Sequence, residues 1–354
     1  MSEQGQPRSG SARPLPNEMS KRHSLALALG QKWLELGRAE TMRKKLAEPA
    51  IEAAIRISAS LAIVGLVLIF VFIGKEALPV LTSAEARREA GLSKLFLPQS
   101  PEPGEPEEFA WQPVSEIPKY SLPPLMTGTI KVTLVALLFG IPLALGAAIF
   151  SSEFAPSWLR EIIKPAIELL SGIPSVVLGF FALMVMATYI QNALGLDYRL
   201  NAVNAGAALG LAVIPIVFTV AEDALTAVPQ SYREGSIALG ATPWQTAWRV
   251  VLPAAFPGIF AACVLGFGRA IGETMIVLMA SGNAAILSWL PTYPLRSLSA
   301  TIAAELGEVV HGSPHYHVLF FIGMLLFVFT LLVNLVAQLS VERLKNRLSG
   351  LVRK

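Results

Sequence analysis

Long apolar runs separated by short polar segments dominate the pattern of this sequence. A helix rises 1.5 Å per residue, so about twenty apolar residues cross the hydrocarbon core of a bilayer. The runs therefore predict an all-α membrane protein with six transmembrane helices. The expected spans are Ile57–Gly74, Thr127–Phe150, Pro165–Ile190, Ala202–Val220, Ala254–Ala280 and Val318–Leu339.

Polar segments lie before the first span and after it. Residues 1–24 are rich in Ser, Gly, Pro and Arg, and we expect them to be disordered. They are not a secretory signal, because no apolar core region follows directly. Residues 25–48 mix leucines with charges and predict a helix that either lies on the membrane surface or is simply solvated. Residues 75–123 read as an acidic, proline-rich loop.

The basic residues predict the orientation of the spans. Residues 1–56 contain ten Lys and Arg, and the basic tail at 341–354 contains five. The loop at 75–123 contains five basic residues against eight acidic ones. Because Lys and Arg are enriched on the cytoplasmic side, we expect both termini in the cytoplasm and this loop outside. An even number of spans agrees with that orientation.

A polar, turn-rich segment at 231–253 interrupts the apolar pattern on the predicted cytoplasmic side. Ser231 followed by Glu234 fits a capping box at the start of a short helix. Gly240 is suited to end that helix in a left-handed conformation. The segment therefore begins with one short helix and a glycine joint.

A second short helix is expected directly after this joint. Thr242, with Pro243 at the first helical position and Gln245 three residues after the cap, fits another capping box. Pro253 is expected to close the helix. An apolar stripe would then offer one face to a partner outside the bilayer; it consists of Trp244, Ala247, Trp248 and Val251. An ordinary amphipathic hairpin is the alternative. A DNA-reading motif is disfavoured, because Arg249 is the only base in this helix.

The fifth span contains two ionisable residues in the stretch Gly268-Arg269-Ala270-Ile271-Gly272-Glu273. In one helix Arg269 and Glu273 would lie one turn apart on the same face. Charges at membrane depth cost about 2.5–3.5 kcal/mol on insertion scales and usually face an interior or a water-filled path. Gly268 and Gly272 would let a helix or a ligand approach the backbone. The alternative is a self-neutralising pair that only helps the helix tolerate burial.

Two further features of the spans leave alternatives open. Between Ser171 and Ser175 a Gly-Ile-Pro sequence interrupts the third span. It either frees backbone amides that line a cavity and suit an anion, or makes a proline kink. Lys131 in the second span is expected to snorkel to the interface, with attraction of an anion as the minority interpretation.

Composition excludes several classes of protein. Hydrophobic residues make up 53% of the chain and charged ones only 15%, against about 25% charged in soluble domains. Cys263 is the single cysteine, so neither a disulfide framework nor a cysteine-based metal site exists. No GxxxxGK[ST] motif is present, so the chain does not bind ATP through a P-loop, and no cofactor is expected. His311, His315 and His317 in an external loop are expected to be solvated rather than to bind a metal.

The segment at 231–253 resembles the loop that marks ABC importer permeases: Glu-Ala-Ala, three residues, Gly, nine residues, Ile-x-Leu-Pro. This sequence has Glu234-Gly235-Ser236, then Gly240, then Val250-Val251-Leu252-Pro253. The spacing matches, while Gly and Ser replace the two alanines and Val replaces Ile. The resemblance implies the type I ABC importer permease fold. It also implies a coupling helix that docks on a separate ATPase subunit, so this chain is not itself an enzyme.

The stretch Arg269-Ala270-Ile271-Gly272-Glu273-Thr274-Met275 is similar to phosphate-specific permeases of the PstC type. Residues 164–175, Lys-Pro-Ala-Ile-Glu-Leu-Leu-Ser-Gly-Ile-Pro-Ser, resemble the same family. The likeness covers about residues 124–340. It implies that Arg269 and Glu273 help to move phosphate. The implied partners are a second, PstA-type permease subunit, two cytoplasmic ATPase subunits and an external phosphate-binding protein in the bacterial inner membrane.

These patterns identify two groups of candidate functional residues. The substrate pathway is expected to include Gly268, Arg269, Gly272, Glu273, Ser171 and Ser175, and ATPase coupling is expected to use Glu234, Gly235, Ser236, Gly240, Trp244, Trp248 and Pro253. Three alternatives stay open. They are an ABC importer for another oxyanion or solute, a secondary transporter without an ATPase, and a mainly regulatory role.

Overall fold

A computed structural model describes residues 49, 51–100 and 107–352 of the chain. The disorder expected for residues 1–24 and the helix expected for residues 25–48 therefore lie outside the described residues. The chain divides into two compact units, Met1–Ile69 and Phe70–Lys354. In the first unit the described residues are helical and largely apolar.

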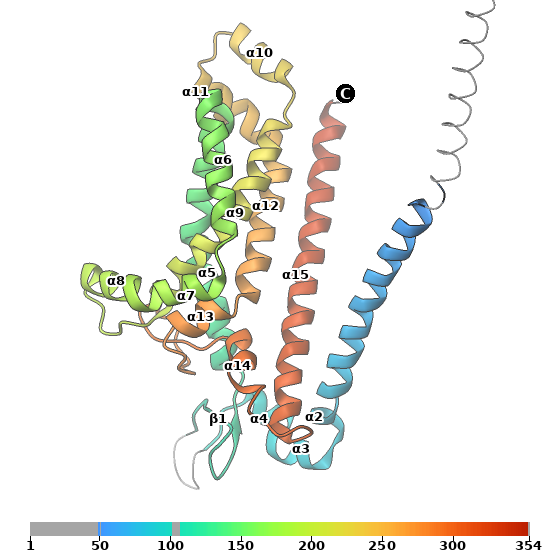
Figure 1. The fold of residues 1–354 in the computed structure, drawn as a ribbon, viewed down its shortest axis with the longest axis vertical. Helices are drawn as coiled ribbons and strands as arrows, with labels where there is room; N and C mark the ends of the chain where they lie inside the picture. Colours follow the sequence, from blue (N-terminus) through green and yellow to red (C-terminus); the bar gives the residue numbers. More distant parts are fainter. Residues whose placement is uncertain (1–48, 50, 101–106, 353–354) are drawn as a thin grey trace, which may run out of the picture. The chain divides into compact units, whose positions relative to one another are not determined.

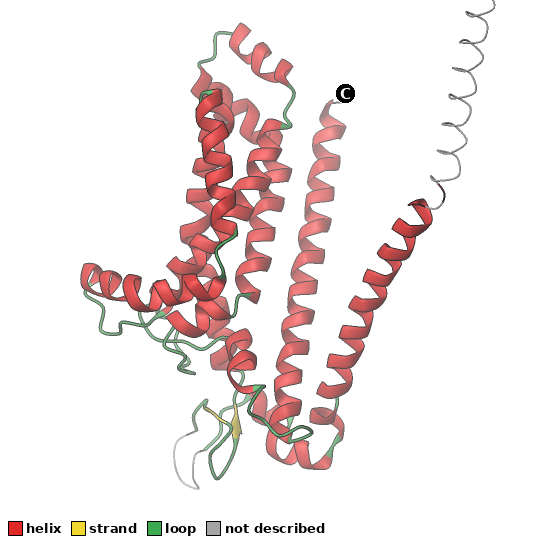
Figure 2. Ribbon diagram, viewed as in Figure 1, coloured by secondary structure: helices red, strands yellow, loops and turns green. Residues whose placement is uncertain are grey.

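The structure confirms the six predicted spans within its described residues. The helices that are long and apolar enough to cross a membrane are Ile51–Thr82, Pro123–Phe154, Ser175–Leu194, Ala202–Thr226, Pro243–Gly272 and Pro314–Arg343. Helices make up most of the described chain, and loops and two short strands make up the rest (Figure 2). The chain is therefore a multi-pass membrane protein.

The labelled helices follow one another in the order shown in Figure 1. Short helices α2 (Pro79–Thr82), α3 (Ala84–Ala90) and α4 (Leu92–Phe96) lead into strands β1 (Trp111–Gln112) and β2 (Lys119–Tyr120). The long helices are α5 (Pro123–Ile149), α6 (Ser157–Ser171), α9 (Ala202–Thr226), α12 (Leu252–Gly272) and α15 (Pro314–Val352). Between them lie α7 (Ser175–Phe181), α8 (Ala187–Leu194), α10 (Gln230–Ala238), α11 (Pro243–Thr246), α13 (Met275–Ala280) and α14 (Leu298–Glu305). Three π-helical turns complete the order: η1 (Phe150–Phe154), η2 (Ala182–Met186) and η3 (Ala247–Val251).

The third span begins ten residues later than the prediction of Pro165–Ile190. Helix α6 ends at Ser171, and the candidate span starts at Ser175 after a break at 172–174. Pro174 disfavours a helical conformation at the residue before it, which accounts for the break. Figure 1 shows α7 and α8 turning away from the direction of α6. The interruption thus joins two helices that run in different directions.

Small residues allow α5 and α9 to form the centre of the second unit. A Cβ added to Gly140 would meet the carbonyl oxygen of Gly210 at 2.9 Å, and one added to Gly210 would meet that of Ala136 at 3.0 Å. Backbones this close need small side chains at the crossing. The surrounding core is made of buried Ala, Val and Leu side chains from α5, α9 and α12. This pair of helices is the frame on which the other elements are placed.

Residues 79–122 fold into a compact region instead of the predicted loop, with residues 101–106 outside the description. Strands β1 and β2 pair antiparallel, with Trp111 opposite Tyr120. A second core gathers Leu95, Trp111, Tyr120 and residues of α14 and α15. We call residues 79–122 the cap. Its apolar residues are spread thinly between charges and prolines, so periodicity alone could not reveal the cap.

Candidate functional site

An open cavity lies between α6, α9 and α12, and Arg269 lines it. We call it the Arg269 cavity. It encloses about 320 Å³, which falls in the range of small-ligand pockets, about 300–1,000 Å³. Glu168 and Ser171 line it from the last turn of α6, while α9 contributes Ala212, Pro215, Ile216, Thr219 and Val220. Four polar or charged side chains, those of Glu168, Ser171, Thr219 and Arg269, thus face an otherwise largely apolar wall.

Arg269 stands in the last turn of α12, and its side chain is exposed. Among the described residues it makes no hydrogen bond and no ion pair. A guanidinium is always charged and offers five N–H donors in a planar fork. The cavity therefore presents an unpaired cation to whatever enters it.

The predicted helical pair of Arg269 and Glu273 is wrong. Helix α12 ends at Gly272, and Glu273 has extended backbone angles, φ −67° and ψ 132°. The Glu273 carboxylate accepts a hydrogen bond from the Met275 amide at 3.2 Å, and its backbone carbonyl accepts one from Ser299 at 2.9 Å. Glu273 therefore lies in a break between α12 and α13. The sequence had suggested one helix that continues through this position.

The structure places only one of the other predicted pathway residues in the Arg269 cavity. Ser171 lines the Arg269 cavity, whereas Ser175 begins α7 beyond the break. The break does not free all its amides, because those of Gly172 and Ile173 donate to the carbonyls of Leu169 and Leu170. A Cβ on Gly268 would lie 3.5 Å from Oδ1 of Asn334 in α15, while Gly272 has nothing within 4 Å. Gly268 therefore has only an ordinary van der Waals contact with α15, and neither glycine shows the close approach predicted for both.

In the segment at 231–253, one of the two predicted capping boxes is absent and the other is present. The Ser231 capping box is absent, because α10 already begins at Gln230 with Pro229 as its N-cap. The Thr242 capping box is present, since Thr242 and Gln245 exchange both hydrogen bonds. Gly240 has φ +86°, the left-handed conformation predicted for the joint.

The second helix of this segment does not end at Pro253. The helix runs on from Pro243 to Gly272, through the π-helical turn η3. Proline cannot donate to the preceding turn, and a wider turn just before it relieves the mismatch. The predicted apolar stripe is split as a result: Trp244 and Trp248 are 60% and 45% exposed, while Ala247 and Val251 are buried.

The exposed part of this segment forms a surface suited to docking. Glu234 is exposed on α10, and a Cβ added to Gly235 would meet nothing within 4 Å. The Ser236 hydroxyl is 2.9 Å from that of Thr246, which ties α10 to α11. The Trp244 ring packs against those of Phe154 and Trp248 in tilted arrangements, with ring centroids 5.7 and 5.6 Å apart. We call residues 230–253 the coupling loop.

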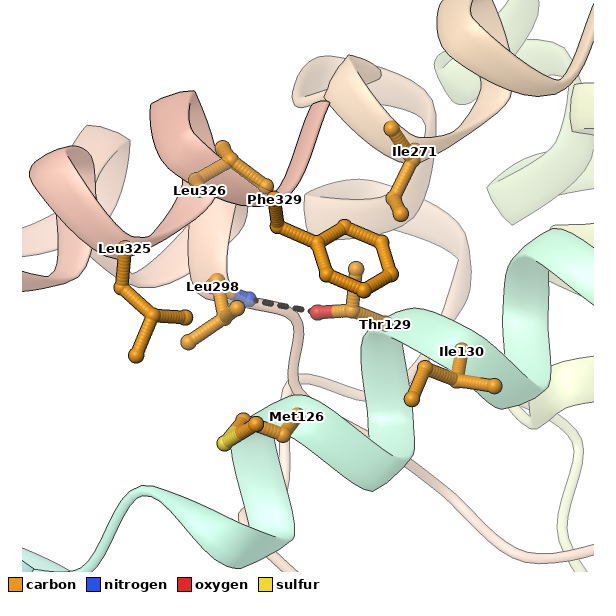
Figure 3. A pocket seen from close by; sticks show the side chains of 8 residues that line it. All are labelled: Met126, Thr129, Ile130, Ile271, Leu298, Leu325, Leu326 and Phe329. Carbon is orange, nitrogen blue, oxygen red and sulfur yellow. Dashed lines mark hydrogen bonds between the residues drawn. The ribbon is translucent and has the colours of Figure 1, made fainter. Parts of the chain in front are cut away.

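A second cavity, drawn in Figure 3, is excluded as a substrate site. It encloses about 30 Å³ between α5, α12, α14 and α15 and is lined by apolar side chains such as Met126, Ile271 and Phe329. Its one hydroxyl, that of Thr129, already accepts the amide hydrogen of Leu298 at 2.9 Å. A cavity of that volume has room for only about two water molecules.

Comparison with known proteins identifies the family. Residues 140–350 match the model of the family "Binding-protein-dependent transport system inner membrane component". The chain belongs to this family. It is 37% identical over 234 residues to a probable ABC transporter permease protein, YqgH, of Bacillus subtilis, a match that covers 66% of this chain and 76% of that protein.

Two further comparisons refine this relationship. This permease is 34% identical to the phosphate transport system permease protein PstC of Xylella fastidiosa, over 67% of this chain and 78% of that protein. Its fold resembles a chain of a bacterial alginate ABC transporter, with a TM-score of 0.51 and 16% identity over 82% of this chain and 94% of that one. The predicted type I ABC importer permease fold is therefore confirmed.

Two sequence expectations about charged residues in this permease are wrong. Lys131 does not snorkel: it is 3% exposed and donates to the carbonyls of Ser288 and Leu290 at 2.9 and 3.2 Å, so it pins the loop after α13. Of the three histidines expected to be solvated, His311 is exposed, but the other two are held by partners. His315 pairs with Glu305, and His317 hydrogen-bonds to the Glu76 carbonyl. In the described part of the chain, no group of three metal-ligating side chains is found.

Three residues that the sequence did not single out have notable positions in the structure. One lines the Arg269 cavity, and the other two form an ion pair at the coupling loop. Glu168 lines the Arg269 cavity, and its position one helical turn before Ser171 was the available signal. Arg233 and Glu153 pair beneath the coupling loop, 80 positions apart in sequence. No local pattern connects two residues at that separation, so only the fold could show this pair.

Proposed function

We propose that this chain is a permease subunit of an ATP-driven importer that moves inorganic phosphate across the bacterial cytoplasmic membrane. The relatives named as phosphate transport permeases support the cargo, and the family supports the class of machine. The observation that carries the proposal is the unpaired guanidinium of Arg269 in a cavity between three helices. ATP hydrolysis would take place on partner subunits that dock on the coupling loop.

Arg269 suits phosphate because a guanidinium binds two oxygens of an oxyanion at once. Charge-assisted hydrogen bonds of this bidentate kind are roughly twice as strong as neutral ones. The cation stands where α12 ends, and the mostly apolar α9 wall lowers the local dielectric and strengthens its attraction for an anion. Since the described residues leave Arg269 unpaired, no resident carboxylate has to be displaced. Glu273, Gly268, Gly272, Ser171 and Ser175 remain proposed pathway residues.

Glu168 gives the cavity a means of choosing among oxyanions. A carboxylate repels a fully deprotonated anion, which opposes sulfate. Phosphate still carries at least one proton at neutral pH and can donate its O–H to a carboxylate oxygen. A site built to accept a hydrogen bond rejects an analogue that lacks the donor, because its own group would stay unpaired. Arg269 and Glu168 together therefore favour phosphate over sulfate.

The proposed complex contains a second, PstA-type permease subunit, two cytoplasmic ATPase subunits and an external phosphate-binding protein. The family description and the relatives' names support a multi-subunit transporter. The exposed Glu234 and the open surface at Gly235 support the coupling loop as the ATPase contact. Copurification of the ATPase should be lost in Glu234→Arg and in Gly240→Val. Undiminished copurification of both variants would contradict a docking role for this loop.

Uptake of labelled phosphate by cells that lack this chain, complemented with variants, tests the cargo. Arg269→Gln removes two charge-assisted hydrogen bonds, each worth about 1.5–3 kcal/mol, so uptake should fall by about a hundredfold or more. Arg88→Gln is the control, because it removes the same charge from an exposed side chain of α3, which belongs to neither the Arg269 cavity nor the coupling loop. Wild-type uptake by Arg269→Gln would overturn the assignment.

Competition by other anions separates phosphate from a different oxyanion. Sulfate and molybdate should compete poorly in the wild type. In Glu168→Gln sulfate should compete better, because the repelling carboxylate is gone while Arg269 remains. Strong competition by sulfate in the wild type would instead identify a general oxyanion importer.

A further inference from the structure

A buried ion pair lies between the coupling loop and the membrane helices. Nε and Nη2 of Arg233 in α10 donate to the two carboxylate oxygens of Glu153 in η1, at 3.1 and 2.7 Å. The two side chains are only 16% and 8% exposed. A bidentate pair of this kind fixes orientation as well as distance. Helix α10 is therefore held rigidly to the end of α5.

The same guanidinium also holds the end of α9. Its Nη1 donates to the Val228 carbonyl at 2.7 Å and its Nη2 to the Leu225 carbonyl at 2.9 Å. The last carbonyls of a helix lack partners within the helix and carry the negative end of its dipole, so a cation there is favourable. One side chain of the coupling loop thus contacts both central helices, α5 through η1 and α9.

A second arginine carries the connection onward to the Arg269 cavity. Arg160 of α6 donates from Nε to the Ser151 carbonyl at 2.9 Å and from Nη2 to the Ser152 carbonyl at 2.8 Å, both at η1. Helix α6 is 15 residues long, which makes a rod of about 22 Å. Its other end carries Glu168 and Ser171 into the Arg269 cavity. The contacts therefore run from α10 through η1 and α6 to the cavity.

We propose that Arg233, Glu153 and Arg160 form a relay that transmits motion of the coupling loop to the cavity wall. This inference rests on the proposed function, because an ATPase partner supplies the motion. Glu234, the next residue along α10, is exposed, so the docking side and the transmitting side of the helix are distinct. When the partner moves α10, η1 follows, and α6 shifts Glu168 and Ser171 relative to Arg269. The three residues are positioning residues and do not touch the cargo.

A comparison with Lys164 shows why Arg233 is suited to connect the coupling loop with the membrane helices. Lys164 also pairs with α9, through Glu222 at 2.9 Å and Asp223 at 3.1 Å, and it does not contact the coupling loop. It links α6 to α9 alone, and its side chain is 36% exposed. Arg233 is less exposed and joins three elements. Among the described residues, it is the charged side chain of α10 that reaches the membrane helices.

The double variant Glu153→Gln/Arg233→Gln is the decisive test. Removing one partner of a buried pair leaves an orphaned charge and costs about 3–5 kcal/mol, whereas removing both avoids that penalty. The double variant should therefore fold and copurify with the ATPase. We expect its ATP hydrolysis to stay within about twofold of the wild type, while phosphate transported per ATP falls by about tenfold. Arg160→Gln should also lower the phosphate transported per ATP, whereas Arg88→Gln on α3 should not.

A distance measurement separates the relay from the identity of the cargo. With Cys263 replaced by Ala, spin labels at Leu169 on α6 and Tyr189 on α8, both exposed, report on the position of α6. In the reconstituted complex ATP should change the distance between the labels in the wild type and in Arg88→Gln. The change should vanish in Glu153→Gln/Arg233→Gln. Phosphate uptake by the unaltered complex tests the proposed function, whereas this distance tests the relay with no cargo present.

Two functional results would overturn the relay. One is a double variant that transports as much phosphate per ATP as the wild type. The other is an unchanged ATP-dependent distance between the labels in that variant. Loss of copurification or monodispersity in the double variant would also contradict it, because the pair would then only stabilise the fold. The conservative variant Arg233→Lys keeps the charge but loses the bidentate guanidinium. It should transport an intermediate amount of phosphate per ATP.

Discussion

At the scale of single residues, charge placement separates groups that work on cargo from groups that hold the fold. Arg269 is exposed in a cavity and unpaired among the described residues, whereas Glu305 is surrounded by partners. Trp111 donates to both Glu305 oxygens at 2.9 and 3.2 Å, and Arg296 and His315 pair with them at 2.5 and 2.9 Å. Glu305 therefore joins the cap to the segment before α14 and to α15.

This arrangement predicts a pH-dependent stability of the cap. Burial alone raises the pKa of the Glu305 carboxyl, but hydrogen bonds from His315 and Trp111 and the charge of Arg296 outweigh it and lower that pKa. A carboxyl whose pKa is lower in the folded state stabilises the fold above its unfolded pKa, about 4.3. The stabilisation disappears as the pH falls from there through the folded pKa. Thermal unfolding of purified protein across this range should show the loss.

Glu305→Gln is the control for that prediction. It leaves Arg296 and His315 without their carboxylate, so at neutral pH the free energy of unfolding should fall by about 3 kcal/mol. Because Gln does not titrate, the variant should not lose further stability in the acid range where the wild type does. Equal acid sensitivity of the two proteins would assign the effect to other carboxyls, such as Glu89 beside Tyr120.

At the scale of elements, the crossing of α5 and α9 depends on glycine. Gly140→Val should separate the two helices, because any Cβ there would meet the Gly210 carbonyl at 2.9 Å. Overpacking of this kind costs about 1–3 kcal/mol or more, and the yield of folded protein should fall. Gly146→Ala is the matched control in the same helix, since nothing lies within 4 Å of its added Cβ. Normal yield of Gly140→Val would show that the helices can move apart at little cost.

The elements also show how far sequence patterns reach. All six spans were predictable, because twenty apolar residues have few alternatives to a membrane helix. Ends of helices were predicted less well. Pro253 was expected to stop a helix that continues, and Gly272 ends a helix that was expected to continue. A proline or glycine marks a local preference, while packing and wider turns decide whether the chain follows it.

The candidate site was predictable in residue identity but not in geometry. Arg269 and Ser171 were both singled out, and the structure places them in one cavity. The partnership of Arg269 with Glu273 failed, because it assumed one uninterrupted helix. Glu153 and Arg233 could not be paired from sequence, since their contact depends on how α5 and α9 end. Long-range pairs of this kind need the fold.

At the scale of the whole molecule, the proposed function requires the coupling loop and the cap to face opposite sides of the membrane. Residues 75–123 carry more acids than bases, and residues 1–56 carry ten bases, so we expect the cap outside and the coupling loop inside. An ATPase subunit is restricted to the cytoplasm. The orientation therefore decides whether an ATPase subunit can contact and move α10, which carries Arg233 and Glu234.

Cysteine labelling in intact cells tests this orientation directly. With Cys263 replaced by Ala, Val114→Cys in the cap and Leu239→Cys in the coupling loop provide equally accessible reporters, because both side chains are 91% exposed. A membrane-impermeant maleimide should label Val114→Cys in spheroplasts and should label Leu239→Cys only after the cells are permeabilised. The matched exposure means that a difference in labelling reports the side of the membrane and not burial. Labelling of Leu239→Cys in intact spheroplasts would place the coupling loop outside, where no ATPase could act on it, and both the import mechanism and the relay would fail together.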